Sequence, residues 1–161
     1  MSETIVIGIG EYIVVNDGTK ISTIGLGSCI GTVVYDEFKK ISGMSHIMLP
    51  KMGQKQDKIG KYADAAIPAM IEEIMKKGAL KNKLKAKIAG GASLFTFSED
   101  QLQIGQRNID AVKKVLMEQD VRLVAEDVGG DKGRTITFNP DNSELLIRMV
   151  RGEGERKEKV I

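Results

Sequence analysis

Residues 21–35 read Ile-Ser-Thr-Ile-Gly-Leu-Gly-Ser-Cys-Ile-Gly-Thr-Val-Val-Tyr, and this stretch decides the fold class. Its two β-branched runs, 21–24 and 30–35, are typical of strands, and the glycine-rich piece between them interrupts the chain. The polar segment 36–40 is suited to a turn. Residues 41–49 are therefore expected to return as the second strand of an antiparallel hairpin.

The pattern outside this stretch adds further strands and two helices. Apolar residues recur at helical spacing over 61–77 and 106–119. Gly78 is expected to close the first helix, while Pro68 either kinks it or marks a late start. The other β-branched runs are residues 4–9, 12–15, 85–89, 122–126, 135–138 and 145–150. Together they predict an α+β fold, with a β-sandwich-like layered sheet core flanked by two main helices.

Length and composition limit the class of protein. The chain has 161 residues, which suits a single domain, placed here at 1–150. Residues 151–161 are charged and are expected to form a disordered tail. The net charge of +2 is spread over interspersed acids and bases, which argues against a nucleic-acid partner. No apolar run approaches membrane-span length, so we expect a cytoplasmic protein without membrane insertion.

The chain has one cysteine and one histidine. An internal disulfide is therefore excluded, and no ligand spacing indicates a metal site, so neither a metal nor a cofactor is expected. Nothing in the sequence indicates a coiled coil or an obligate interface. A monomer, or a heterodimer with a partner, is the expected state.

The single cysteine, Cys29, and the single histidine, His46, both fall on the predicted hairpin. If the hairpin is centred on Glu37 and Phe38, Cys29 lies directly opposite His46, with Cβ atoms roughly 4.5–5.5 Å apart. Thr23 is an even number of residues before Cys29 and faces the same side in an extended chain. A slip of one residue would separate the pair.

Such a constellation predicts acyl transfer from an amide or an ester through a thioester. Cys29 would be the nucleophile, His46 its base and later its acid, and Thr23 the hydroxyl that orients the imidazole. A neighbouring imidazolium lowers a thiol pKa from about 8.5 to ~3.5–7.5. Backbone N–H groups at Gly27 and Ser28 are candidates for stabilising the oxyanion.

Other interpretations of these residues stay open on spacing alone. A lone cysteine after small residues is usually a buried, inert side chain, and a lone strand histidine is usually structural. Two further motifs are set aside. Residues 25–30 begin like a dinucleotide-binding loop, but a strand pattern follows and no acid lies about 20 residues on. Residues 27–31 match a nucleophile elbow, which requires a helix after the nucleophile.

Several motifs together resemble the CheD family of chemoreceptor glutamine deamidases. Thr23–Cys29 and Met44–Pro50 carry the resemblance most clearly, and it extends over residues 5 to about 150. It includes the segments Gly60–Asp64, Lys87–Phe95, Ile104–Asn108 and Ala125–Gly130. Asp141–Glu144 departs from the glycine turn that the family often has there.

The resemblance implies a fold, a reaction and partners. It implies a Cys29–His46–Thr23 triad, conversion of receptor glutamines to glutamate with release of ammonia, and a fold similar to the cytotoxic necrotising factor catalytic domain. A CheC-type phosphatase is the implied regulatory partner. A predominantly non-catalytic adaptor, a receptor methylesterase and a cysteine protease remain as alternatives.

The paired glycines have two interpretations. Gly90, Gly91, Gly129 and Gly130 most simply serve tight turns. The second interpretation is that they line the substrate cleft.

Overall fold

The computed structural model describes residues 3–93, 99–151 and 155–161. Over these residues the chain forms ten strands, two α-helices and two 3₁₀ turns. In chain order they are β1 (Thr4–Ile7), β2 (Tyr12–Val15), β3 (Lys20–Leu26), β4 (Ile30–Asp36), β5 (Ile41–Ile47), η1 (Ile59–Lys61), α1 (Ala63–Lys76), η2 (Lys81–Lys83), β6 (Lys85–Gly90), α2 (Glu99–Glu118), β7 (Arg122–Val128), β8 (Arg134–Asn139), β9 (Glu144–Arg151) and β10 (Glu155–Val160).

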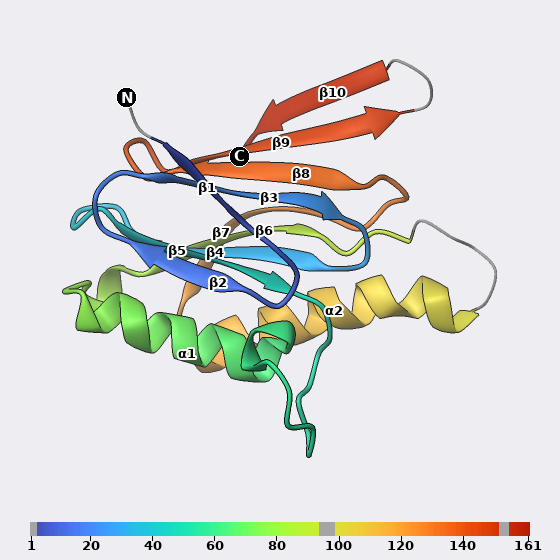
Figure 1. Ribbon diagram of the computed structural model, residues 1–161, viewed down its shortest axis with the longest axis horizontal. Helices are drawn as coiled ribbons and strands as arrows, with labels where there is room; N and C mark the ends of the chain where they lie inside the picture. The colour runs from blue at the N-terminus through green and yellow to red at the C-terminus, as the bar shows by residue number, and fades with distance from the viewer. Residues whose placement is uncertain (1–2, 94–98, 152–154) are drawn as a thin grey trace.

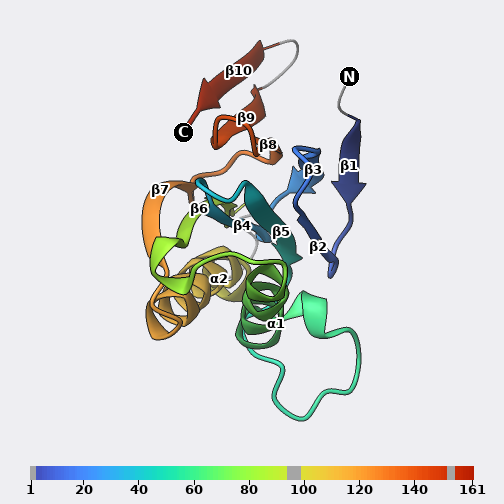
Figure 2. The ribbon, with the colours of Figure 1, turned by 90° about the vertical axis from the view of Figure 1, so that its left-hand side faces the viewer.

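The strands form two sheets of five. The outer sheet has the order β1-β3-β8-β9-β10, and the central sheet has the order β2-β5-β4-β6-β7. Figure 1 shows α1 and α2 side by side against the central sheet, with the outer sheet on its other face, and Figure 2 shows the same three layers from the side. The predicted α+β class and the layered sheet core with two helices are confirmed. The likeness to the toxin catalytic domain stays a prediction.

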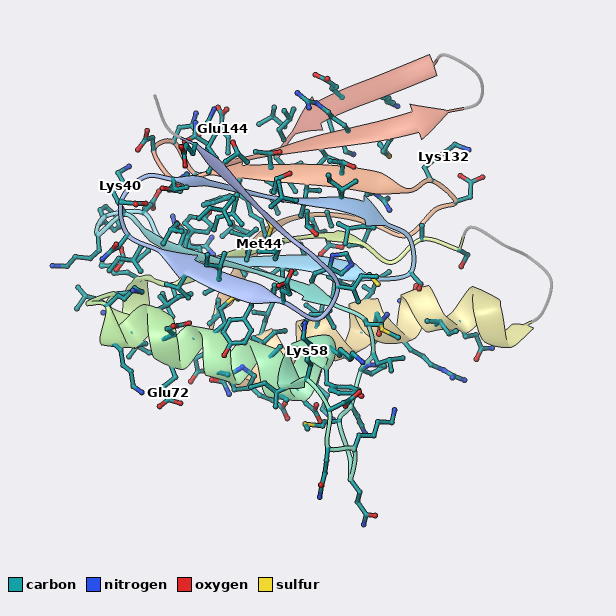
Figure 3. All side chains as sticks on the ribbon, viewed as in Figure 1. Lys40, Met44, Lys58, Glu72, Lys132 and Glu144 are labelled. Atoms are coloured by element: carbon teal, nitrogen blue, oxygen red, sulfur yellow. The ribbon has the colours of Figure 1, made fainter. Side chains whose placement is uncertain are left out.

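Side chains along β5 point alternately into two hydrophobic cores, one between the central sheet and the helices and one between the two sheets. Ile41 and Ile47 pack toward the helices, whereas Met44 packs in the core between the sheets. Figure 3 shows Met44 in this layer. At Gly43 an added Cβ would lie 2.9 Å from Cγ of Met70 on α1. The period of two along a strand therefore places His46 on the Met44 side, between the sheets.

The helix boundaries follow the sequence in part. Gly78 (φ +114°) follows the last residues of α1, as predicted, and Pro68 lies inside that helix. The predicted start of α2 at 106 is wrong, because the helix begins at Glu99. Its first turns contain Gly105, whose added Cβ would lie 2.5 Å from the Gly91 carbonyl. This glycine lets α2 approach the turn after β6 closely, but it also weakens the apolar pattern that marks a helix.

The hairpin of β4 and β5 is real, but its predicted centre is wrong. Gly31, not Cys29, lies opposite His46, and Asp36 lies opposite Ile41. The Asp36 carboxylate accepts hydrogen bonds from the N–H groups of Phe38 and Lys39, both 3.0 Å. These local bonds fix a turn of four residues and shift the pairing by two. A slip of two keeps every side chain on its expected face.

Residues 155–161 of the C-terminal segment are ordered, contrary to the expected disordered tail. Glu155–Val160 forms β10, antiparallel to β9, and Leu145 and Ile161 exchange two backbone hydrogen bonds of 3.0 Å. Main-chain hydrogen bonds do not require apolar side chains, and charged residues are common on edge strands. Residues 152–154 lie outside the described residues, as does 94–98, which contains the end of the Lys87–Phe95 motif. No helix among the described residues is long and apolar enough to cross a membrane.

Candidate active site

The three predicted catalytic residues come together in the layer between the sheets. Thr23 lies at the middle of β3 in the outer sheet, His46 near the end of β5 in the central sheet, and Cys29 just before β4. Figure 1 shows the second half of β3, the end of β5 and the start of β4 on the same side of the molecule. Thr23 and His46 are buried, while Cys29 is partly buried against the core between the sheets. The site therefore bridges the two sheets.

His46 is held by its main chain on both edges of β5. Its N–H donates to the Glu11 carbonyl and its own carbonyl accepts from the Gly10 N–H, both at 3.0 Å. On the other edge it pairs with Gly31, where an added Cβ would lie 2.4 Å from Cδ1 of Ile136. The imidazole therefore starts from a fixed backbone.

The hydrogen bonds of Thr23 fix the tautomer of His46. The Thr23 hydroxyl donates its single proton to the Ile7 carbonyl at 2.8 Å, since a carbonyl can only accept. The same oxygen lies 2.7 Å from Nδ1 of His46 and must therefore accept from an Nδ1–H group. A neutral imidazole with its proton on Nδ1 has a lone pair on Nε2. Nε2 is thus the basic atom.

That basic atom has no hydrogen-bond partner within the part of the chain that the structure describes. Because Gly31 lies opposite His46, Cys29 occupies the diagonal position two residues along on the same face. Diagonal neighbours in a sheet lie roughly 7–8 Å apart between Cα atoms, closer between side chains. The thiol and the imidazole are thus neighbours without a direct hydrogen bond.

Burial sets the charge state of this pair. It raises the pKa of the Cys29 thiol and lowers the pKa of His46 below its ordinary value of 6.5. Both shifts favour the neutral forms. Burial thus favours a thiol and a neutral imidazole over a thiolate beside an imidazolium.

Gly90 and Gly91 hold the loop that carries Cys29. The Gly91 N–H donates to the Cys29 carbonyl at 2.9 Å, and the next N–H, of Ala92, donates to the Gly27 carbonyl at 2.8 Å. Gly90 has φ +117°, and an added Cβ there would lie 2.2 Å from the Cys29 carbonyl oxygen. Only glycine fits this contact.

Gly129 and Gly130 lie next to that pair. The Gly129 N–H donates to the Gly90 carbonyl at 2.9 Å. Arg134 donates to the Gly90 and Gly129 carbonyls at 3.3 and 2.8 Å. Gly90 and Gly91 thus contact the nucleophile loop and Gly129 contacts Gly90, while the part of all four glycines in a substrate cleft stays a prediction.

Three backbone donors beside the thiol are available to a ligand. Among the described residues, the N–H groups of Gly27, Ser28 and Cys29 have no hydrogen-bond partner. The first two are the predicted oxyanion donors, and that role stays a prediction. Within the same residues, no three His, Cys, Asp or Glu side chains gather as a metal site requires.

Asn108 is a residue at this site that the sequence reasoning missed. Its side chain is fully buried, and its amide nitrogen donates to the Ser28 carbonyl at 2.9 Å and to the Met48 carbonyl at 3.0 Å. One amide thus joins the nucleophile loop to the segment after His46. The available signal was a polar residue four positions before Val112, on the buried stripe of the second helix.

Comparison with known proteins identifies relatives over the whole chain. The family model described as CheD chemotactic sensory transduction matches residues 48–149. The chain is 46% identical to the chemoreceptor glutamine deamidase CheD of Halalkalibacterium halodurans, over 98% of this chain and 99% of the relative. It is 47% identical to the protein of the same name from Thermotoga maritima, over 95% of this chain and 96% of that relative. A probable chemoreceptor glutamine deamidase CheD of Clostridium novyi is 48% identical over 89% of this chain and 91% of that relative.

The family model covers α1 and α2 but begins after the three catalytic candidates. The similarity over residues 1–47 therefore comes from the relatives matched over nearly their full length.

Proposed function

Because this chain belongs to the CheD family, we propose that it is a protein-glutamine deamidase of methyl-accepting chemotaxis receptors. It hydrolyses selected glutamine side chains to glutamate and releases ammonia. The substrate is supported by the names of the relatives. The observation that carries the chemistry is the Thr23–His46 hydrogen bond of 2.7 Å, because it leaves Nε2 of a buried imidazole as a base beside the lone thiol.

The first half of the reaction forms a thioester. As the Cys29 sulfur attacks the side-chain carbonyl carbon of glutamine, the thiol proton passes to Nε2 of His46. The carbonyl oxygen gains the negative charge and accepts hydrogen bonds from free backbone N–H groups of residues 27–29. The carbon–nitrogen bond then breaks, and Nε2 returns its proton to the departing amine, which leaves as ammonia.

The second half regenerates the thiol. His46 takes a proton from water as the water attacks the thioester carbon. The carbon–sulfur bond breaks, glutamate is formed, and the proton returns to the Cys29 sulfur. Thr23 keeps its hydrogen bond to Nδ1–H in both charge states of the imidazole, so the ring stays oriented throughout.

The proposal also includes a regulatory partner and a cellular compartment. A CheC-type phosphatase is proposed as the regulatory partner and the cytoplasm as the compartment, and both have the family resemblance as their support. The partner would tune the deamidase, and the deamidase would stimulate the partner.

Mass spectrometry of a cognate receptor cytoplasmic domain tests the function. Wild-type protein should convert particular glutamines to glutamate, whereas Cys29→Ala and His46→Ala should lose roughly 10³-fold or more of the rate. Because burial lowers the pKa of His46, the rate should fall on the acid side only below pH 6.5, where the imidazole becomes protonated.

Ser45→Ala is the matched control. Ser45 precedes His46 on β5, is buried, and its hydroxyl has no partner among the described residues, so the variant should keep full activity. Methanol release without ammonia would favour a methylesterase, and backbone fragments a protease. A receptor left unchanged by wild type, with partner binding retained in Cys29→Ala, would replace the deamidase with the adaptor.

A further inference from the structure

We infer that Asn108 is a positioning residue that orients the peptide group between Ser28 and Cys29, so that the Cys29 N–H points at the oxyanion. The inference rests on the proposed acyl transfer to Cys29. It assigns a defined task to a buried residue on α2 that does not touch the reacting atoms.

The first observation is the pair of hydrogen bonds from one nitrogen. Nδ2 of Asn108 lies 2.9 Å from the Ser28 carbonyl and 3.0 Å from the Met48 carbonyl. Two carbonyl oxygens can only accept, so the NH₂ end of the amide must face them. The orientation of the Asn108 side chain follows from its partners.

The second step is the geometry of the peptide group. No described peptide bond is cis, so the Ser28 carbonyl and the Cys29 N–H point in opposite directions in one plane. Asn108 draws the carbonyl toward α2, and the Cys29 N–H therefore points away from the helix. This N–H has no partner among the described residues, and it belongs to the nucleophile itself.

The third observation is that close contacts fix the positions of the segments that Asn108 joins. The second hydrogen bond of Asn108 fixes the Met48 carbonyl, just after the strand that carries His46. Gly105, one helical turn earlier, packs against the Gly91 and Ala92 carbonyls, where an added Cβ would lie at 2.5 and 2.8 Å. The nucleophile loop, the end of β5 and α2 are therefore locked together around one amide.

The fourth observation concerns the oxygen of the same amide. Oδ1 of Asn108 is buried and has no hydrogen-bond partner among the described residues. An unsatisfied buried acceptor costs stability. The polar contacts of the Asn108 side chain are therefore those of Nδ2 with the two carbonyls.

The experiment separates oxyanion stabilisation from the reactivity of the thiol. In Asn108→Leu both carbonyls lose their donor, and in Asn108→Asp a carboxylate opposes them. For receptor deamidation and for acylation of Cys29 by p-nitrophenyl acetate, the catalytic rate should fall about 10²–10³-fold, as when one oxyanion donor is lost. The KM for the receptor should change little, because the interaction acts in the transition state. Alkylation of Cys29 by iodoacetamide forms no oxyanion and should keep the wild-type rate.

The pH profile adds a second readout that a packing role would not give. In Asn108→Asp, burial and the two carbonyls raise the pKa of the new carboxyl group, whose neutral form has one O–H donor. The acylation rate relative to wild type should therefore recover in part as the pH falls. Asn108→Leu, which has no titrating group, should show no recovery.

Gln103→Glu is the control, because it makes the same amide-to-acid change on the exposed face of α2. Acylation within a small factor of wild type in folded Asn108→Leu would overturn the inference, and so would alkylation that falls in parallel with acylation. If wild type acylates Cys29 but does not deamidate the receptor, the proposed substrate is wrong and the Asn108 inference is still decided by acylation. Folding of each variant is checked by circular dichroism.

Discussion

At the scale of single residues, Thr23 controls where the proton of a neutral His46 sits. Thr23→Val keeps the shape of the side chain but removes the oxygen that accepts from Nδ1–H and donates to Ile7. The imidazole is then free to carry its proton on Nε2, where it is no longer a base toward the thiol. We expect the catalytic rate to fall about 10²-fold or more, since a wrong tautomer alone costs up to ~10⁴ in serine proteases.

Thr23→Ser is the matched variant, because it retains the hydroxyl, and it should keep most of the activity. The tautomer itself is measurable by ¹⁵N NMR of the imidazole, without ambiguity in a chain with one histidine. Wild type and Thr23→Ser should show the proton on Nδ1. A Thr23→Val protein with the same tautomer and rate would remove Thr23 from the mechanism.

The residues of the site were predictable to different degrees. Cys29, His46 and Thr23 stood out because two of them are unique in the chain and all three fall on one expected face. The register shift of two did not disturb that face, although it came from side-chain bonds of Asp36 that pattern alone does not reveal. Asn108 was missed because its partners are the main chains of Ser28 and Met48, and main-chain positions leave no mark in a sequence.

At the scale of elements, the turn after β6 supports the nucleophile loop through a contact that only glycine allows. Gly90→Ala and Gly129→Ala make a matched pair, because both residues have positive φ, +117° and +82°. At Gly129 an added Cβ has open space, whereas at Gly90 it would lie 2.2 Å from the Cys29 carbonyl. Gly129→Ala should cost about 1–2 kcal/mol for the backbone conformation alone.

Gly90→Ala should cost more than about 3 kcal/mol, because relief of the clash must move the Cys29 loop. Its activity should fall in the folded fraction, while Gly129→Ala remains active. Urea unfolding and deamidation rates check both effects. Equal stabilities for the two variants would mean that the loop carrying Cys29 can move away from residue 90 without a loss of folding free energy.

The elements themselves were easier to predict than their pairing. Period-two and helical patterns located all the strands up to β9 and both helices, because these patterns are local. The order β1-β3-β8 depends on contacts between distant segments, and β1 even pairs with β3 in parallel. The charged strand β10 was predicted as a tail, because its stability comes from the edge of β9 rather than from its own composition.

At the scale of the whole molecule, the catalytic residues lie on different sheets, so the reaction depends on how the sheets are held together. Thr23 belongs to the outer sheet and His46 to the central sheet, and a shift of one sheet against the other would break their hydrogen bond. The apolar core between the sheets resists separation, but apolar contacts are not directional. Directional contacts across this layer therefore have a special importance for alignment.

Arg134 makes such contacts close to the site. From β8 in the outer sheet it donates to the Asp127 carboxylate at 3.1 Å and to the Gly90 and Gly129 carbonyls, all on the side of the central sheet. Its side chain is 5% exposed and that of Asp127 is 11% exposed. Lys159 of β10 also contacts Asp127, at 2.8 Å, so the C-terminal strand joins the same cluster. A planar guanidinium can serve several acceptors in fixed directions, which a lysine cannot.

Arg134→Met should therefore destabilise the fold by about 3–5 kcal/mol, the usual cost when one partner of a buried ion pair is removed. Arg148→Met is the matched control, because Arg148 also lies in the outer sheet and its ion pair with Glu158 is more than half exposed on both sides. Such surface pairs contribute only about 0–1 kcal/mol. Urea unfolding measures both variants. Similar losses of unfolding free energy in the two variants would show that the apolar core alone aligns the sheets. A large loss confined to Arg134→Met, with a lower deamidation rate in the folded protein, would show that this cluster keeps Thr23 in register with His46.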